Sequence, residues 1–360
     1  MSAPFKEQLN VQRVEELAAS LDLSRAFVQQ ATNDLGELEL KDRVILVSDA
    51  LAAHLPKPVP VALDHLVARY GWQEPTDLGL WPVLRFVEDH ALEHPTEALL
   101  AMRALTSTFS AEFAVRPYLR RYPEQALDFL RANREHPSQH VRRWVSEGSR
   151  PRLPWGARLR AFQHDPQPVL ELIEALLDDP EEYVRRSVAN NLNDISKDHP
   201  ELLVAWCAQR MQTSRKRLFR HALRGLLKAG QPQAMELMGF GSPRLEGATL
   251  KANSPVRIGE KVEIVAVLEL ANPQPLMLDL AIEYVDAKGG RSRRKVFKGG
   301  VKQAPAGTFT WSKRLNMKQV SVRRLYPGEH AVQLLVNGVP SARAVFTLVD
   351  PAADEPPAGR

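Results

Sequence analysis

The sequence predicts a mainly α-helical protein: a solenoid of HEAT-like helical repeats followed by an all-β, immunoglobulin-like sandwich. Apolar residues recur at helical spacing up to about residue 240, and short alternating apolar runs separated by turn residues follow from Gly241. A segment near the middle of the chain also repeats itself. We therefore expect residues 1–240 to form the helical domain, residues 241–350 the sandwich and residues 351–360 a disordered tail.

The composition is that of an ordinary globular protein. Of the 360 residues, 44% are hydrophobic and 25% are charged, and the net charge of +5 is only modestly basic. The single cysteine, Cys207, excludes an internal disulfide and a cysteine-based zinc site. The histidines show no paired metal spacing, and nucleotide-binding glycine motifs are absent, so we expect no metal and no cofactor. The N-terminus lacks a signal peptide and no stretch is long and apolar enough for a bilayer, which predicts a cytoplasmic protein without a membrane partner.

Helical pairs account for the first part of the chain. The opening segment carries Val14, Leu17 and Leu21 at helical spacing. Further on, HPSQHVRRWVSEG matches DPEEYVRRSVANN at a spacing of 43 residues, and SRKRLFRHALRGL is a looser copy. A helix that begins at a proline precedes each copy, starting at Pro123, Pro166 and Pro200. A repeated helix pair of this length is typical of HEAT-like solenoids, which stack around a concave face.

The second helix of each pair carries an arginine at an equivalent position. The apolar positions expected to face the core are Val141, Val145, Val184, Val188, Leu218 and Ala222. Beside them lie Arg143, Arg186 and Arg220, and this column predicts a basic stripe suited to a phosphate backbone. We assign the same DNA-binding role to Arg152, Lys197 and Arg224. For any one of these arginines, the alternative is a solvated side chain paired with an acidic neighbour.

Carboxylates within this basic surface are the candidate catalytic groups. Glu147 and Asp194 lie on the second helices, and Glu112 lies on the analogous segment of the preceding repeat. A carboxylate beside a phosphate-binding surface weakens binding by repulsion, but it can stabilise an oxocarbenium-like sugar or orient an attacking water. The alternative is a simple ion pair, of Glu112 with Arg116 or of Asp194 with Arg186 or Lys197.

Trp155 completes the candidate site. It stands between Pro154 and Gly156, which is a loop or helix-entry context in which the ring can lie against a deoxyribose or a base. Packing between helices is the alternative. We expect Trp144 and Trp206, which fall on helical apolar faces, to be core residues.

The C-terminal part reads as a β-sandwich of about seven short strands. The runs that predict them are VEIVAVLEL, LDLAIEYVD, KVFKGG, FTWSKRL, HAVQLLVNG and ARAVFTLVD. A basic run, RSRRKVFK, is expected to fall between strands and to reach DNA through Arg291, Arg293 and Arg294. A solvated basic hairpin is the alternative.

Three long segments resemble one known family. FSAEFAVRPYLRRYPE, HPSQHVRRWVSEGSRPRLPWG and DPEEYVRRSVANNLNDISKDHPELL are similar to the DNA alkylation-repair glycosylases AlkC and AlkD, over roughly residues 5–235. The segments EFAVRPYL, SRPRLPWG and NNLNDISKDHP are of the AlkC type, and an appended immunoglobulin-like domain occurs in some proteins of that type.

The resemblance implies a monofunctional DNA glycosylase that starts base excision repair. Its expected substrates are cationic alkylated bases in duplex DNA, especially 3-methyladenine and 3-methylcytosine, and it is expected to act as a monomer. The family's active-site acids correspond to Glu112, Glu147 and Asp194, and its active-site tryptophan corresponds to Trp155. The alternative function is that of a non-catalytic HEAT-repeat scaffold that binds DNA or another protein.

Overall fold

The chain folds into two compact units in a computed structural model that describes residues 5–290, 294–319 and 324–350. The first unit contains Met1–Leu203 and Met211–Ala222, and the second contains Val204–Arg210 and Leu223–Arg360. Helices fill the first unit, and strands dominate the second, so the predicted fold class is confirmed. The boundary expected near residue 240 stays a prediction.

The α-helices follow one another along the chain with short connections. Their bounds are α1 (Val11–Ser20), α2 (Arg25–Thr32), α3 (Leu40–His54), α4 (Val59–Tyr70), α5 (Trp81–His90), α6 (Pro95–Leu105), α7 (Arg116–Arg121), α8 (Pro123–Ala132), α9 (Gln139–Gly148), α10 (Arg160–His164), α11 (Gln167–Glu174), α12 (Glu182–Ile195), α13 (Pro200–Gln209), α14 (Lys216–Ala222), α15 (Arg224–Ala229) and α16 (Pro232–Leu237). Short 3-10 turns are η1 (Phe5–Gln8), η2 (Leu35–Glu37), η3 (Leu78–Leu80) and η4 (Thr213–Arg215).

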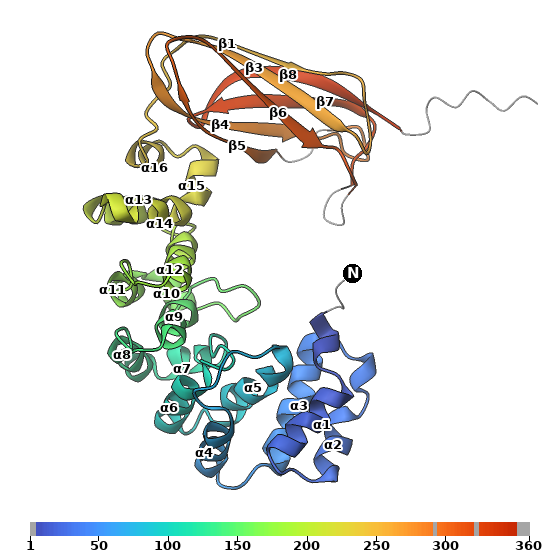
Figure 1. The fold of residues 1–360 in the computed structure, drawn as a ribbon, viewed down its shortest axis with the longest axis vertical. Helices are drawn as coiled ribbons and strands as arrows, with labels where there is room; N and C mark the ends of the chain where they lie inside the picture. The colour runs from blue at the N-terminus through green and yellow to red at the C-terminus, as the bar shows by residue number, and fades with distance from the viewer. Residues whose placement is uncertain (1–4, 291–293, 320–323, 351–360) are drawn as a thin grey trace, which may run out of the picture. The chain divides into compact units, whose positions relative to one another are not determined.

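The predicted repeats stack through their equivalent helices. In the first unit α9 packs on α12 and α12 packs on α14, while α8 packs on α11 in a second layer (Figure 1). The six apolar positions expected to face the core, from Val141 to Ala222, are all buried. Trp144 and Trp206 are buried as predicted. Each helix pair buries its apolar face against the next pair, and the candidate residues lie along the second helices and in the segments that follow them.

One continuous helix beyond Arg220 is not observed. The helical spacing of Arg220, Arg224 and Lys228 predicts one face of one helix, but α14 ends at Ala222 and α15 begins at Arg224. Leu223 separates them with a non-helical ψ of 5°. Arg224 therefore belongs to a separate helix, in the second unit.

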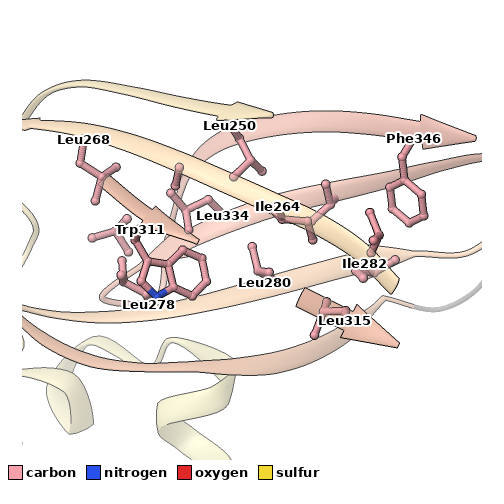
Figure 2. Packing of buried hydrophobic residues seen from close by; sticks show 14 of the residues in the cluster. Leu250, Ile264, Leu268, Leu278, Leu280, Ile282, Trp311, Leu315, Leu334 and Phe346 are labelled. Carbon is pink, nitrogen blue, oxygen red and sulfur yellow. The ribbon is translucent and has the colours of Figure 1, made fainter. Parts of the chain in front are cut away.

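The second unit is a sandwich of two sheets. Its strands are β1 (Leu245–Ala252), β2 (Val256–Arg257), β3 (Lys261–Leu270), β4 (Gln274–Glu283), β5 (Lys295–Ala304), β6 (Gly307–Asn316), β7 (Gly328–Val336) and β8 (Val339–Val349). One sheet has the order β1-β3-β6 and the other the order β2-β8-β7-β4-β5. Alternate residues of β3 point inward, and Ile264 and Leu268 meet Leu280 and Leu334 of the facing sheet in the core (Figure 2).

Part of the predicted basic hairpin belongs to a strand. Lys295 and Lys298 lie within β5 and pair with β4, so the expectation that the whole RSRRKVFK run falls between strands is wrong for its second half. Arg294 immediately precedes β5. Arg291 and Arg293 lie outside the described residues.

Candidate active site on the helical unit

Two of the predicted acids are buried at the C-terminal ends of neighbouring second helices. Glu147 lies near the end of α9 and Asp194 near the end of α12, and the Asp194 side chain is only 2% exposed. A buried carboxylate needs a counter-charge or several hydrogen bonds. Arg150 provides the charge for both: its Nη1 lies 2.6 Å from Oε1 of Glu147 and its Nε lies 2.8 Å from Oδ2 of Asp194.

Further polar contacts complete this buried network. The Ser187 hydroxyl donates to Oε2 of Glu147 at 2.6 Å, and Nζ of Lys197 lies 2.9 Å from Oδ1 of Asp194. Burial lowers the pKa of Arg150, but the charge of Glu147 and the hydrogen bond to Asp194 outweigh burial and raise that pKa overall. Arg150 is therefore a permanent cation, and the two carboxylates are held in fixed positions.

Glu112 faces an open pocket rather than this buried network. It forms an ion pair with Arg143, whose guanidinium also donates to the Ser110 hydroxyl at 2.6 Å and lies 3.6 Å from Oε1 of Glu147. Burial lowers the pKa of Arg143, and the charges of Glu112 and Glu147 raise it overall. Arg143 thus links Glu112 to Glu147, and Arg150 links Glu147 to Asp194, so the three predicted carboxylates form one cluster.

The pocket beside Glu112 has a volume of about 390 Å³. Its wall combines aromatic rings, hydroxyl groups and one ion pair, contributed by Pro75, Thr76, Leu78, Trp81, Thr106, Ser107, Thr108, Phe109, Ser110, Glu112, Phe113, His140, Arg143, Trp155 and Tyr183. The Tyr183 ring lies below the Arg143 guanidinium, 5.4 Å from its carbon to the ring centroid. Such a wall suits a planar or cationic ring and its sugar better than a phosphate.

Trp155 stands at the edge of this pocket. Its side chain is 61% exposed, its φ is +66°, and its ring is parallel to that of Trp81 at a centroid distance of 6.4 Å. A positive φ is strained for a bulky residue, which indicates that the surrounding structure holds it there. The loop position predicted from the sequence is confirmed, and Trp155 is not packed between helices.

Arg116 holds the loop that carries Trp155. Its guanidinium is buried and donates to the carbonyl oxygens of Gly148 at 3.0 Å, Arg150 at 2.9 Å and Ala157 at 2.6 Å. Burial lowers its pKa to about 10. The ion pair of Glu112 with Arg116, considered as an alternative role for this acid, is not what the structure shows, because Glu112 pairs with Arg143.

The remaining predicted DNA contacts differ in their surroundings. Arg186 on α12 is 67% exposed and lies 3.4 Å from Glu182. Arg152 donates to Asp198 at 2.8 Å, and Lys197 is the half-exposed partner of Asp194. Arg220 is partly buried on α14. Arg143 and Arg186 therefore differ although they occupy equivalent repeat positions: Arg143 lines the pocket, and Arg186 is exposed to solvent.

Sequence reasoning missed four residues of this region: Trp81, Arg116, Arg150 and Tyr183. Arg150 had a signal, since it follows Glu147 by three residues in the SEGSRPR segment. The roles of Trp81 and Arg116 depend on partners more than 30 residues away, and local spacing does not reveal such pairs.

Over the described residues, no group of histidine, cysteine or acidic side chains is arranged to hold a metal ion. In the same ranges, no single helix is long and apolar enough to span a membrane, although α3 and α4, bent by 114°, pass that test as a pair.

Comparisons with known proteins define the class of this one. The model of a family described as "DNA alkylation repair enzyme" matches residues 109–226, which include all three acids and Trp155. A second family model, described as the C-terminal Ig-like domain of the uncharacterised protein YhaZ, matches residues 246–350. The fold and the site region are thus those of a repeat protein of DNA alkylation repair with an appended Ig-like domain.

Two relatives extend this similarity over almost the whole chain. The uncharacterized protein YhaZ of Bacillus subtilis (strain 168) is 35% identical over 348 residues, which are 93% of this chain and 95% of that protein. The structure of Pseudomonas fluorescens alkylpurine DNA glycosylase AlkC, bound to DNA containing an abasic site analog, is similar with a TM-score of 0.89 and 32% identity, over 96% of this chain and 100% of that one. The chain belongs to the AlkC and AlkD family of HEAT-like repeat DNA alkylation-repair proteins.

Proposed function

We propose that this protein is a DNA glycosylase that hydrolyses the N-glycosidic bond of cationic alkylated bases in duplex DNA. The observation that carries the proposal is the cluster of Glu112, Glu147 and Asp194, with Glu112 and the exposed ring of Trp155 lining one pocket. The similarity to a protein described as an alkylpurine DNA glycosylase, over nearly the full length of both chains, supports it.

The chemistry follows from the charge of the lesion. Alkylation makes the base a cation, so when the bond between its nitrogen and C1′ breaks, both electrons stay with the base and it leaves uncharged. The positive charge moves to the sugar, where Glu112, oriented by Arg143 and Ser110, is placed to stabilise it. The water that attacks C1′ gives its proton to a carboxylate of the cluster or to solvent.

Trp155 contributes the binding of the sugar. Its ring is held in a strained conformation against Trp81, so it meets the substrate without first losing conformational freedom. An exposed aromatic face can lie against the deoxyribose without needing a particular base. This arrangement favours recognition of the sugar and the charge over the base itself, which supports 3-methyladenine and 3-methylcytosine as the proposed substrates.

We propose a monofunctional reaction, without a covalent intermediate on lysine. Lys197 is the lysine of the cluster, and its Nζ lies 2.9 Å from the Asp194 carboxylate. That contact engages the amine with a carboxylate, so it is not free to attack C1′. A cationic leaving base also needs no covalent activation.

We further propose that the protein acts as a monomer on the bacterial nucleoid, in the cytoplasm and without a cofactor.

The decisive experiment is a base-release assay on duplexes that contain one defined lesion. We expect release of 3-methyladenine and 3-methylcytosine, an abasic product that breaks only after alkali, and no product trapped by borohydride. Binding of the duplex without release of either base would favour a non-catalytic scaffold. A borohydride-trapped adduct would contradict the monofunctional reaction alone.

A further inference from the structure

A second exposed tryptophan stands beside the pocket and has no role in the proposed reaction. Trp72 lies on the loop between α4 and η3, and half of its side chain surface is exposed. Its φ is +59°, so Trp72, like Trp155, holds a bulky side chain in the left-handed region. A strained conformation persists only where the surrounding structure enforces it, and such residues cluster at binding and active sites.

The loop of Trp72 is fixed to the end of α6 by backbone hydrogen bonds. The Trp72 amide donates to the Ala104 carbonyl at 2.9 Å, and the Thr76 amide donates to the Thr108 carbonyl at 2.8 Å. Thr76 and Thr108 both line the 390 Å³ pocket, so this loop forms part of its wall. Trp72 is not itself one of the lining residues, but the amide of its neighbour Gln73 donates to the hydroxyl of Thr108 in this wall at 3.2 Å.

The ring of Trp72 is supported in the same way as that of Trp155. It stacks on His136 with an interplanar angle of 7° and a centroid distance of 5.3 Å. Burial, with the charges of Arg103 and Arg142, lowers the pKa of His136, which keeps the supporting ring uncharged at neutral pH. Each exposed tryptophan thus has a parallel ring behind it, His136 for Trp72 and Trp81 for Trp155.

We propose that Trp72 is a second aromatic contact for DNA, which stacks on a nucleobase beside the lesion while Trp155 meets the lesion sugar. The inference rests on the proposed function and adds to it separate roles for the two exposed tryptophans. Trp155 acts at the sugar whose bond breaks, and Trp72 binds the neighbouring nucleotide. A stacking contact is uncharged, so its contribution to affinity is independent of salt, unlike that of a phosphate contact.

The test uses Trp72→Asn in the full chain, because asparagine accepts the left-handed backbone that strains tryptophan. We expect this variant to unfold at the same temperature as the wild type or at a higher one. We also expect it to bind a duplex with an abasic-site analogue roughly tenfold more weakly or worse at every salt concentration. The slope of log affinity against log salt should stay unchanged, and Trp72→Phe should restore most of the affinity.

A duplex with 2-aminopurine beside the abasic analogue supplies a direct reading of stacking. The wild type and Trp155→Leu should quench its fluorescence, whereas Trp72→Asn should not. Below saturation, Trp72→Asn should excise more slowly than the wild type in proportion to its weaker binding, whereas Trp155→Leu should stay slow even when the enzyme is saturating. Leu202→Ala, which removes exposed apolar surface on α13, is the matched control and should behave as the wild type.

Trp72→Asn that binds within about twofold of the wild type, or that still quenches 2-aminopurine, overturns the inference. A lower unfolding temperature with unchanged affinity assigns Trp72 a structural role instead. These results are distinct from failure of the proposed function, in which the wild-type protein itself releases no base.

Discussion

Arg150 bridges two buried acids that come from different repeats, and this gives it more influence on stability than an ordinary surface arginine. Its two contacts tie the end of α9 to the end of α12. The same residue offers its backbone carbonyl to Arg116, which fixes the Trp155 loop. The acids and the aromatic edge of the pocket are thus positioned through one short segment of chain.

Replacement of the carboxylates should separate catalysis from binding. Glu112→Gln, Glu147→Gln and Asp194→Asn should each slow single-turnover base excision by about a hundredfold or more, because in the proposed reaction each acid supplies a preorganised charge to the sugar cation. The affinity for an abasic-analogue duplex should change far less. Asp198→Asn, which changes the neighbouring contacts with Arg152 and Gln163 outside the acid cluster, is the control. Near wild-type excision rates in all three variants would contradict the assignment of these acids.

Removal of Arg150 should cost much stability. In Arg150→Met, Glu147 and Asp194 lose their shared counter-charge while they remain buried, and the loss of one partner of a buried pair typically costs about 3–5 kcal/mol. Arg152→Met, at a partly exposed pair, should cost about 1 kcal/mol or less. Urea unfolding of the two variants measures the difference. Equal losses of unfolding free energy in the two variants would show that the buried contacts of Arg150 stabilise the fold no more than the pair formed by Arg152.

The second helices α9, α12 and α14 carry the predicted arginine column, but the arginines in it have different surroundings in the structure. Arg143 is engaged with Glu112 at the pocket, whereas Arg186 is largely exposed. A phosphate contact therefore suits Arg186 better, because an exposed guanidinium loses less when it changes partner.

The salt dependence of DNA binding tests this column. Arg186→Ala should lower the slope of log affinity against log salt by about one unit, and Arg220→Ala should do the same if it meets a phosphate. Arg143→Ala should change that slope less and excision more. The control is Arg131→Ala on α8, in the other layer of helices. An unchanged slope in an Arg186 and Arg220 double variant would remove the column from the interface.

The sequence predicted helices and strands where periodicity was strong and failed where it was weak. β3 alternates strictly between inward and outward residues and was predicted from its pattern. β1 was missed because only Leu250 of its eight residues is buried, so its pattern does not alternate. The break at Leu223 was also missed, since helical spacing continues across it.

The sequence indicates which residues belong to the candidate site, but not which of them contact one another across the repeats. The acids and Trp155 stood out because they are unusual in a basic or loop context. Arg150 did not stand out as the partner of Asp194, because the two are 44 residues apart and only the stacking of repeats brings them together. Spacing of three or four residues predicted the pair of Asp194 with Lys197, which the structure contains, and the pair of Glu112 with Arg116, in place of which Glu112 pairs with Arg143.

Strand β7 contains a buried histidine that makes the sandwich sensitive to acid. His330 accepts a hydrogen bond from the Val285 amide through Nδ1, and its Nε2 lies 3.0 Å from the Tyr326 carbonyl oxygen, so the neutral ring satisfies both nitrogens. Burial lowers the pKa of His330, against the opposing effect of the Tyr326 carbonyl. The unfolded chain, with a histidine pKa of about 6.5, therefore binds this proton more readily than the folded chain.

Acidification should weaken the second unit through this residue. The stability contribution of neutral His330 is complete above about pH 6.5 and is lost as the pH falls towards the lower folded pKa. His330→Gln lacks this dependence, so the difference in unfolding temperature between the wild type and the variant should shrink as the pH falls from about 7.5 to about 5.5. An NMR titration of His330 that gives a pKa above 6.5 would contradict the prediction.

At the scale of the whole molecule, the last helices belong with the β-sandwich. Gly230, in the left-handed conformation at the end of α15, approaches Gly338 so closely that a Cβ on Gly338 would lie 2.5 Å from the Gly230 Cα. The side chain of Asn337 also donates to the Gly241 carbonyl at 2.9 Å. A short connection thus fixes the sandwich to α15 and α16, so the second unit includes helices as well as strands.

This organisation bears on what the second unit does for DNA binding. The pocket and the acid cluster lie wholly in the first unit. Truncation after residue 240 removes the sandwich and keeps α15 and α16 of the second unit, so it should leave the first unit folded with its acids in place. We propose that the sandwich adds further DNA contacts of its own through Arg294 and Lys295. The truncated protein should therefore bind an abasic-analogue duplex more weakly and excise more slowly below saturation.

Full-length Arg294→Glu with Lys295→Glu, which keeps the sandwich and reverses its charge, should show the same weakening. Full affinity and rate in both proteins would assign the sandwich another task, and contact with a protein partner would then be the better explanation.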